Sequence, residues 1–151
     1  GRFSNDEVSE SVKKELGGRL ELSKDERIKR LSCFLEVLLW EGWTFPRGAQ
    51  GPCVPEFYYA VIGLTNRFAP IFSYVDVTDD GKLNRDLIEN MKKMHNQLLD
   101  KLFILNYRDG ECLKYTYIKS EKGIEEKEEK SSIDSKVMSN IISEICSYII
   151  Q

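Results

Sequence analysis

The segment Trp40-Glu-Gly-Trp43-Thr-Phe45-Pro-Arg47-Gly-Ala-Gln-Gly-Pro-Cys-Val-Pro-Glu-Phe57-Tyr58-Tyr59 separates two strongly apolar helical patterns in the first half of the chain. Its prolines and glycines break regular structure, so we expect a loop between two helices. Aromatic side chains this dense in a loop either fill the seam between the helices or form a contact surface for a partner. The sequence leaves both alternatives open, and it predicts these partner-binding residues: Trp40, Trp43, Phe45, Arg47, Phe57 and Tyr58.

Two helices are predicted before this segment. Ser4 and Glu7 form a capping-box signature at the start of a peripheral helix within residues 1–22. Ser23 and Glu26 repeat the signature at the start of a second helix, which continues to the aromatic segment. We expect this second helix to bury a wide apolar face made by Ile28, Leu31, Phe34, Leu35, Leu38 and Leu39.

Two further helices are predicted after the aromatic segment. A proline at position 55 fits the first turn of a helix whose apolar positions continue to residue 68. Asn84 is a favourable N-cap for a long helix with one apolar face, ending near residue 105. The stretch Thr78-Asp-Asp-Gly81 between them predicts a turn.

The second half of the chain contains a β-hairpin pattern. Residues 103–107 and 112–118 flank a turn in which Asp109-Gly110 supplies the positive-φ position. The charged stretch 119–132 holds almost no apolar residues, so we expect a mobile loop there. Residues 133–151 carry an apolar stripe and are expected to dock as a final helix.

These patterns together predict a mainly α fold of about five helices with a small β-hairpin, in one compact domain. The core helices and the hairpin occupy residues 23–118 of that expected domain, and the helix within residues 1–22 lies at its periphery. The length of 151 residues is sufficient for one such core.

Composition narrows the function classes. The chain holds 22 basic and 25 acidic residues, a net charge of -3, which disfavours a dominant nucleic-acid or membrane-surface footprint. It contains no apolar run long enough to span a bilayer and no secretory signal pattern. Because it starts with Gly, we expect an excised part of a longer protein. The four cysteines, Cys33, Cys53, Cys112 and Cys146, lack zinc-site spacing. We therefore expect an intracellular protein, cytoplasmic or nuclear, without a metal or cofactor.

Three short patterns suggest chemistry, and each has a simpler structural interpretation. Asp76 to Gly81 resembles part of a calcium-binding loop, but Leu87 stands where the bidentate glutamate is required, so a polar turn is predicted. Gly48-Ala-Gln-Gly51 resembles the RNA-clamping loop of KH domains, but the flanking elements do not match. The single histidine, His95, has no catalytic partner at a telling spacing. We therefore expect a protein that is not an enzyme.

An alternative function is binding of nucleic acid. The helix that starts at Asn84 and the hairpin after it resemble the recognition helix and wing of a winged-helix domain. In this alternative, five basic residues would contact phosphate: Lys92, Lys93, Lys101, Arg108 and Lys114.

A helix with Ile28-Lys-Arg-Leu31 leads to a glycine and an aromatic-proline step, Gly42-Trp43-Thr-Phe45-Pro46. A loop with prolines and a very apolar helix at 57–68 follow. This order, over residues 26 to about 105, resembles the divergent calponin-homology heads of the kinetochore microtubule-attachment complex and of related ciliary proteins. The resemblance implies a helical head that binds a microtubule or a partner protein through basic residues.

The favoured interpretation is a protein–protein interaction module in a larger intracellular assembly, possessing no enzymatic activity. The resemblance adds a cytoskeletal or chromosome-associated setting for that assembly. The partner is expected to be another protein, and the aromatic segment is expected to supply rigid anchors for it.

Overall fold

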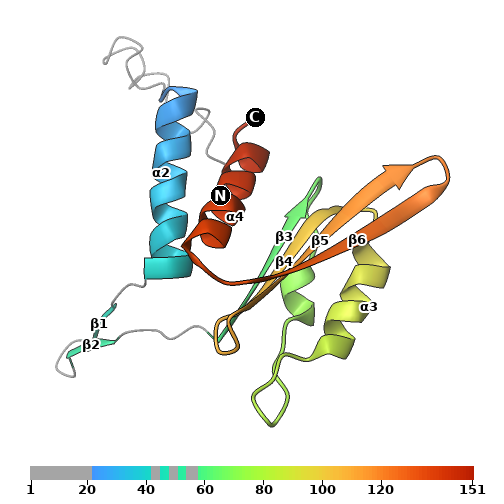
Figure 1. Cartoon of the computed structure of the whole chain (residues 1–151), viewed down its shortest axis with the longest axis horizontal. Coiled ribbons are helices and arrows are strands. Elements are labelled where there is room, and N and C mark those ends of the chain that lie inside the picture. The colour runs from blue at the N-terminus through green and yellow to red at the C-terminus, as the bar shows by residue number, and fades with distance from the viewer. Residues whose placement is uncertain (1–21, 42–44, 48–50, 54–57) are drawn as a thin grey trace, which may run out of the picture.

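The computed structural model describes residues 22–41, 45–47, 51–53 and 58–151. Residues 1–21, which carry most of the predicted peripheral helix, lie outside the described residues, as do Trp43 and Phe57. The described residues form an α+β fold in which helices cover both faces of a four-stranded antiparallel sheet (Figure 1). The prediction of a mainly α fold with about five helices is therefore wrong.

The sheet is a sequential meander. Its strands, in order across the sheet, are β3 (Tyr59–Thr65), β4 (Leu99–Asn106), β5 (Glu111–Ser120) and β6 (Gly123–Ser132). Strands β3 and β6 are its two edges. A separate antiparallel pair, β1 (Phe45–Arg47) and β2 (Gly51–Cys53), lies between α2 and β3 in the chain.

The three α-helices of the described residues are α2 (Lys24–Glu36), α3 (Arg85–His95) and α4 (Ser135–Ile149). A π-helical turn, η2 (Val37–Glu41), extends α2, and a 3-10 turn, η4 (Ile71–Tyr74), precedes α3. The predicted caps are confirmed: Ser23 Oγ accepts from Glu26 N at 3.2 Å, and Asn84 Oδ1 accepts from Leu87 N at 3.3 Å. These caps satisfy amide groups that a helix leaves unpaired at its start.

The sheet separates two apolar layers. On one face, Ile88 and Met91 of α3 pack against Leu102 and Ile104 of β4. On the other face, Phe103 of β4 belongs to a cluster with buried residues of α4, and α2 packs beside α4 (Figure 1). Period-two alternation along β4 therefore directs successive side chains into two different cores.

Strand β3 replaces the helix predicted at 57–68. Its apolar residues alternate between the two cores: Val61 packs on the α3 side, whereas Ala60 and Ile62 pack on the α4 side. A strand covered on both faces has apolar residues at nearly every position, which resembles a buried helix in sequence. The β-branched residues Val61, Ile62 and Thr65 favour the strand.

The resemblance between a strand buried on both faces and a buried helix also explains why α3 ends earlier than predicted. This helix was predicted to reach residue 105, but it stops at His95, and β4 begins at Leu99. The residues from Leu102 to Leu105 are almost fully buried because both faces of β4 are covered. The predicted hairpin is confirmed, with Gly110 at φ 67° in its turn.

The charged stretch 119–132 is the region where the structure differs most from the prediction. It was predicted to be a mobile loop, yet Gly123–Ser132 forms β6 and pairs with β5 over ten residue pairs. Gly123, at φ 124°, turns the chain between the two strands. The charged side chains of β6 find opposite charges on neighbouring elements, so the strand needs few apolar residues of its own.

Candidate functional site

Helix α2 has apolar side chains on two faces. Leu31 is buried on the face toward α4, where it packs with Ile142 and Cys146. A second set of apolar side chains projects to solvent. Cys33 and Phe34 of α2 belong to it, as do Val37 and Trp40 of the π-helical turn η2 that extends α2, and we call these four residues the outer face of α2. The exposed fractions are 57% for Phe34, 40% for Val37 and 46% for Trp40.

The outer face changes character along the helix. In its first turns, Arg30 Nε lies 3.0 Å from Glu26 Oε1, and both side chains are largely exposed. An exposed pair of this kind contributes little to stability. The apolar surface starts at Cys33, one turn beyond this pair, and continues to Trp40. The helix thus presents an apolar patch with a charged border, which is the usual composition of a protein-binding surface.

A hydrogen bond holds the backbone at Leu39, the residue before Trp40. Tyr107 Oη donates a hydrogen bond to the carbonyl oxygen of Leu39 at 2.7 Å, and the Leu39 side chain is buried. Burial raises the pKa of Tyr107 to about 12, so its hydroxyl remains a donor at neutral pH. This bond ties η2 to the end of β4, and Trp40 is left on the solvent side.

The other predicted partner-binding residues are distributed along the following chain. Tyr58 is half exposed, and the Arg108 guanidinium lies 4.7 Å from its ring centroid. This contact joins the start of β3 to the β4–β5 turn, a cation–π arrangement. Phe45 and Arg47 lie in β1, opposite Cys53 and Gly51 of β2. Trp43 and Phe57 lie outside the described residues.

The sequence assigned Phe34 to the buried face of its helix, and this assignment is wrong because the side chain is more than half exposed. The sequence reasoning also did not identify Val37 as a surface residue. A signal was present: Cys33, Val37 and Trp40 repeat at i, i+4 and i+7, beside a second stripe through Leu31, Leu35 and Leu38. A helix with two such stripes has apolar side chains on two of its faces.

The basic residues of the nucleic-acid alternative do not form one surface. Lys92 and Lys93 lie on α3, on one side of the sheet. Lys101 and Lys114 lie on the opposite side, where their Nζ atoms are 3.6 Å and 2.7 Å from Glu144 of α4. Arg108 stacks on Tyr58 at the β4–β5 turn. The fold thus divides the four lysines between the two faces of the sheet and places Arg108 at a turn.

Lys92 is a buried lysine that is paired with two exposed glutamates, Glu89 and Glu126. Its side chain is 7% exposed, and its Nζ lies 2.8 Å from Glu126 Oε1 and 3.0 Å from Glu89 Oε1. The Nζ also lies 3.9 Å from the ring centroid of Tyr115. Burial opposes the charged form, but Glu126 and Glu89 outweigh it and hold the pKa of Lys92 above its ordinary value. This lysine joins α3 to β5 and β6, and it does not have the depressed pKa of a lysine nucleophile.

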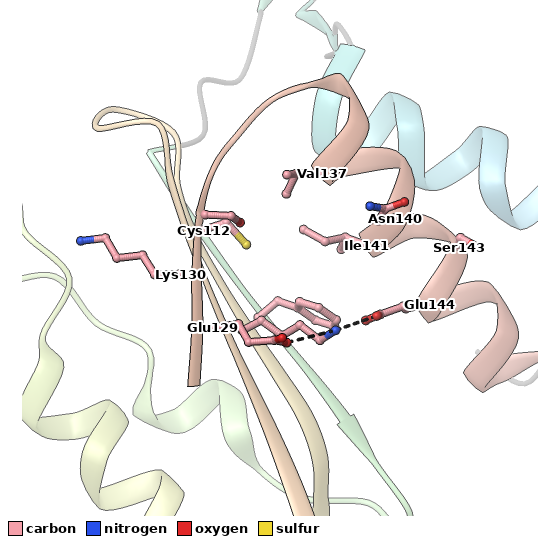
Figure 2. A pocket seen from close by; sticks show the side chains of 11 residues that line it. Cys112, Glu129, Lys130, Val137, Asn140, Ile141, Ser143 and Glu144 are labelled. Carbon is pink, nitrogen blue, oxygen red and sulfur yellow. Dashed lines mark hydrogen bonds and ion pairs between the residues drawn. The ribbon is translucent and has the colours of Figure 1, made fainter. Parts of the chain in front are cut away.

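A groove of about 530 Å³ lies on the other face, between α4 and β6. Lys114 bridges it, with Nζ 2.7 Å from Glu144 Oε1 and 3.7 Å from Glu129 Oε2, and these contacts are the dashed lines between the two glutamates in Figure 2. Its apolar floor includes Cys112, whose thiol pKa is raised by burial. Reactive cysteines have a lowered pKa, so Cys112 does not have the character of a reactive thiol. The groove is not predicted from the sequence, because the charge pattern of residues 119–132 predicts a loop where β6 lies.

Within residues 22–41, 45–47, 51–53 and 58–151, no group of three or more His, Cys, Asp or Glu side chains is arranged to hold a metal ion. The ring of His95 packs edge-on against Tyr74, with centroids 5.6 Å apart. The segment from Asp76 to Lys82 forms a closed turn, in which Thr78 Oγ1 donates to the carbonyl oxygen of Lys82 at 3.0 Å. No helix of the described part of the chain is both long enough and apolar enough to cross a bilayer.

No protein-family model, curated protein or solved structure matches this chain.

Proposed function

We propose that this chain is a protein–protein interaction module that binds its partner through the outer face of α2. The observation that carries the proposal is the exposure of Phe34, Val37 and Trp40 on a helix whose opposite face is already buried. Exposed large apolar residues grouped in one patch are characteristic of interaction sites. Tryptophan is also the residue type that most often dominates interface energies.

The partner we propose is an amphipathic helix of another protein. The outer face repeats at i, i+4 and i+7, a spacing that matches the ridges and grooves of a second helix. The Glu26–Arg30 pair at one end offers both signs of charge to a polar rim on that partner. The module would then act as one subunit of a larger assembly.

We propose an intracellular setting for this assembly. Cys33 is an exposed free thiol at one end of the proposed contact surface, and Cys112 and Cys146 are buried free thiols. Free thiols persist in reducing compartments, whereas secreted proteins mostly carry disulfides. The proposal rests on the outer face of α2 and does not extend to a cytoskeletal or chromosome-associated role.

The test starts with capture of interacting proteins and continues with a purified candidate partner. Phe34→Ser and Trp40→Ala are each expected to weaken binding at least about tenfold in calorimetry, because each removes a central apolar anchor. Phe72→Ser is the matched control, since Phe72 is 68% exposed but lies in η4, away from α2. A partner whose affinity falls with Phe72→Ser and not with the α2 variants would contradict the proposal.

The nucleic-acid alternative is tested in the same samples. Because the four lysines are divided between two faces of the sheet and Arg108 stacks on Tyr58, we expect no binding to duplex DNA or RNA that weakens steeply with salt. Salt-sensitive binding lost on Lys93→Glu, with the α2 variants unaffected, would favour that alternative.

A further inference from the structure

Strand β6 is a ten-residue edge with one side unused. All its residues from Gly123 to Ser132 pair with β5. Among the strands that the structure describes, none pairs with its other side (Figure 1). Alternate residues of β6 therefore present backbone N–H and C=O groups along that side, which is a template for another strand.

Charged residues on an edge strand usually discourage such pairing, but the charges of β6 are complementary to their own reversed order. Two copies related by a two-fold axis perpendicular to the sheet would form one continuous antiparallel sheet. In such a sheet, two residues that lie directly opposite each other point to the same face. The axis therefore passes between two copies of one residue, which lies opposite itself, and we describe this residue as being on the axis. With Glu128 on the axis, Lys127 lies opposite Glu129 and Glu126 lies opposite Lys130, and symmetry makes each contact twice.

Neighbouring registers are less favourable. With Lys127 on the axis, Glu126 would face Glu128 and Glu125 would face Glu129, so every charged pair would be repulsive. With Glu129 on the axis, opposite charges meet in only one kind of pair, Glu128 with Lys130. The register centred on Glu128 combines the most opposite-charge contacts with nearly the full length of β6, and charge specifies register in this way in sheets and coiled coils.

Several of these side chains are already held in place within one copy. Glu126 is bound to Lys92 at 2.8 Å, and Lys130 lies 3.1 Å from Glu111. On the other face, Lys127 lies 3.6 Å from Glu129, which also contacts Lys114. Side chains that are held before association lose less conformational freedom when they bind.

We propose that β6 pairs antiparallel with β6 of a second copy of this chain, centred on Glu128, to form a continuous sheet across a dimer. The two-fold axis places both α4 helices on the same face of that sheet. The groove between α4 and β6 (Figure 2) then lies on that same face in each copy. This surface is separate from the outer face of α2, so either proposal can fail without the other.

Sedimentation equilibrium over a range of protein concentrations tests the dimer. The unmodified chain is expected to dimerise, and Lys127→Glu and Glu129→Lys are each expected to weaken the homodimer about tenfold or more, because each turns two attractive contacts into repulsive ones. A one-to-one mixture of the two variants is expected to form a heterodimer. The two substituted side chains then meet with opposite charges, and the remaining pair, the unmodified Lys127 of one chain and the unmodified Glu129 of the other, is also attractive. Circular dichroism of each variant checks that the sheet is retained.

An unmodified chain that stays monomeric at about 100 µM would overturn the proposal. A dimer that both single variants leave unchanged would also overturn it, because association would then use another surface. Glu128→Gln supplies a third measurement that does not depend on charge reversal. It removes the repulsion between the two Glu128 carboxylates on the axis, so the dimer is expected to tighten about twofold to fivefold. A dimer weakened by Glu128→Gln would exclude this register.

Discussion

The outer face of α2 and the free edge of β6 are both exposed, but they differ in every property that governs recognition. The first is an apolar patch on a helix, with Trp40 and Phe34 as its largest side chains. The second is a charged strand whose backbone is unpaired on one side among the described strands. An apolar patch gives affinity without a fixed register, whereas an edge strand with ordered charges specifies register and partner. The two proposals therefore use separate surfaces, one for another protein and one for a second copy.

The largest expected effect separates the two faces of α2. Leu31 is 3% exposed and Phe34 is 57% exposed on the same helix. Leu31→Ala is expected to lower the free energy of unfolding by about 2–5 kcal/mol, because it leaves a cavity against α4. Phe34→Ala is expected to change it by about 0.5 kcal/mol or less. Denaturant melts of both variants provide the measurement, and a large loss for Phe34→Ala would show that the outer face is covered.

The second effect concerns the attachment of β6 to the core. Lys92→Ala is expected to cost about 2 kcal/mol, because it removes the buried cation that joins Glu89 and Glu126 under Tyr115. Amide exchange in β6 is expected to speed up more than exchange in β4. Lys93→Ala is the matched control, since Lys93 is the exposed neighbour on α3. Equal exchange rates in β6 before and after Lys92→Ala would mean that backbone pairing with β5 alone holds the strand.

Local signals in the sequence predicted the parts of the fold that depend on few neighbours. Ser23 and Asn84 cap helices as expected, and Asp109-Gly110 makes the turn of the central hairpin. The errors at β3 and in β4 share one cause: a strand buried on both faces has the same apolar composition as a buried helix. Strand β6 could not be predicted because its stability comes from β5 and Lys92, which are distant in sequence.

The candidate site divides in the same way. Trp40 is predicted as a contact residue, and it is exposed, so its contact with a partner stays a prediction. Phe34 was assigned to the core because its helix has two apolar stripes, and periodicity alone does not say which stripe faces the protein. The groove beside α4 required β6 to be a strand, so no local pattern indicated it.

A smaller effect is expected from the hydrogen bond between Tyr107 and the backbone of Leu39, the residue before Trp40. Tyr107→Phe removes the hydrogen bond to the Leu39 carbonyl and is expected to cost about 1 kcal/mol. The pKa of Tyr107 is raised by burial to about 12, above the value of about 10 for an unfolded chain. As the pH rises above about 10, Tyr107 ionises in the unfolded chain but not yet in the folded chain. The stability that comes from the protonated Tyr107 is therefore lost between pH about 10 and pH about 12.

Unfolding of the unmodified chain and of Tyr107→Phe across this alkaline window gives the measurement. The variant is expected to lose less stability per pH unit, because one of the tyrosines with a raised pKa is absent. Tyr148, whose pKa is raised to about 12 by burial and by Asp100, remains in both proteins and supplies a common background. Parallel stability curves for the two proteins would mean that Tyr107 ionises freely in the folded chain.

The smallest expected effect is a difference in salt dependence between dimerisation through β6 and partner binding through the outer face of α2. Raising the ionic strength from about 0.05 M to about 0.5 M screens exposed charges, because the Debye length shortens to a few ångströms. Dimerisation through β6 relies on exposed pairs such as Lys127 with Glu129, so its constant is expected to fall a few-fold, by about 1 kcal/mol or less. Partner binding through Phe34 and Trp40 buries apolar surface and is expected to change by less than about twofold. If both interactions weakened equally, a single surface with shared charges would serve both. That result would contradict the proposal that the outer face of α2 binds a partner and that β6 binds a second copy.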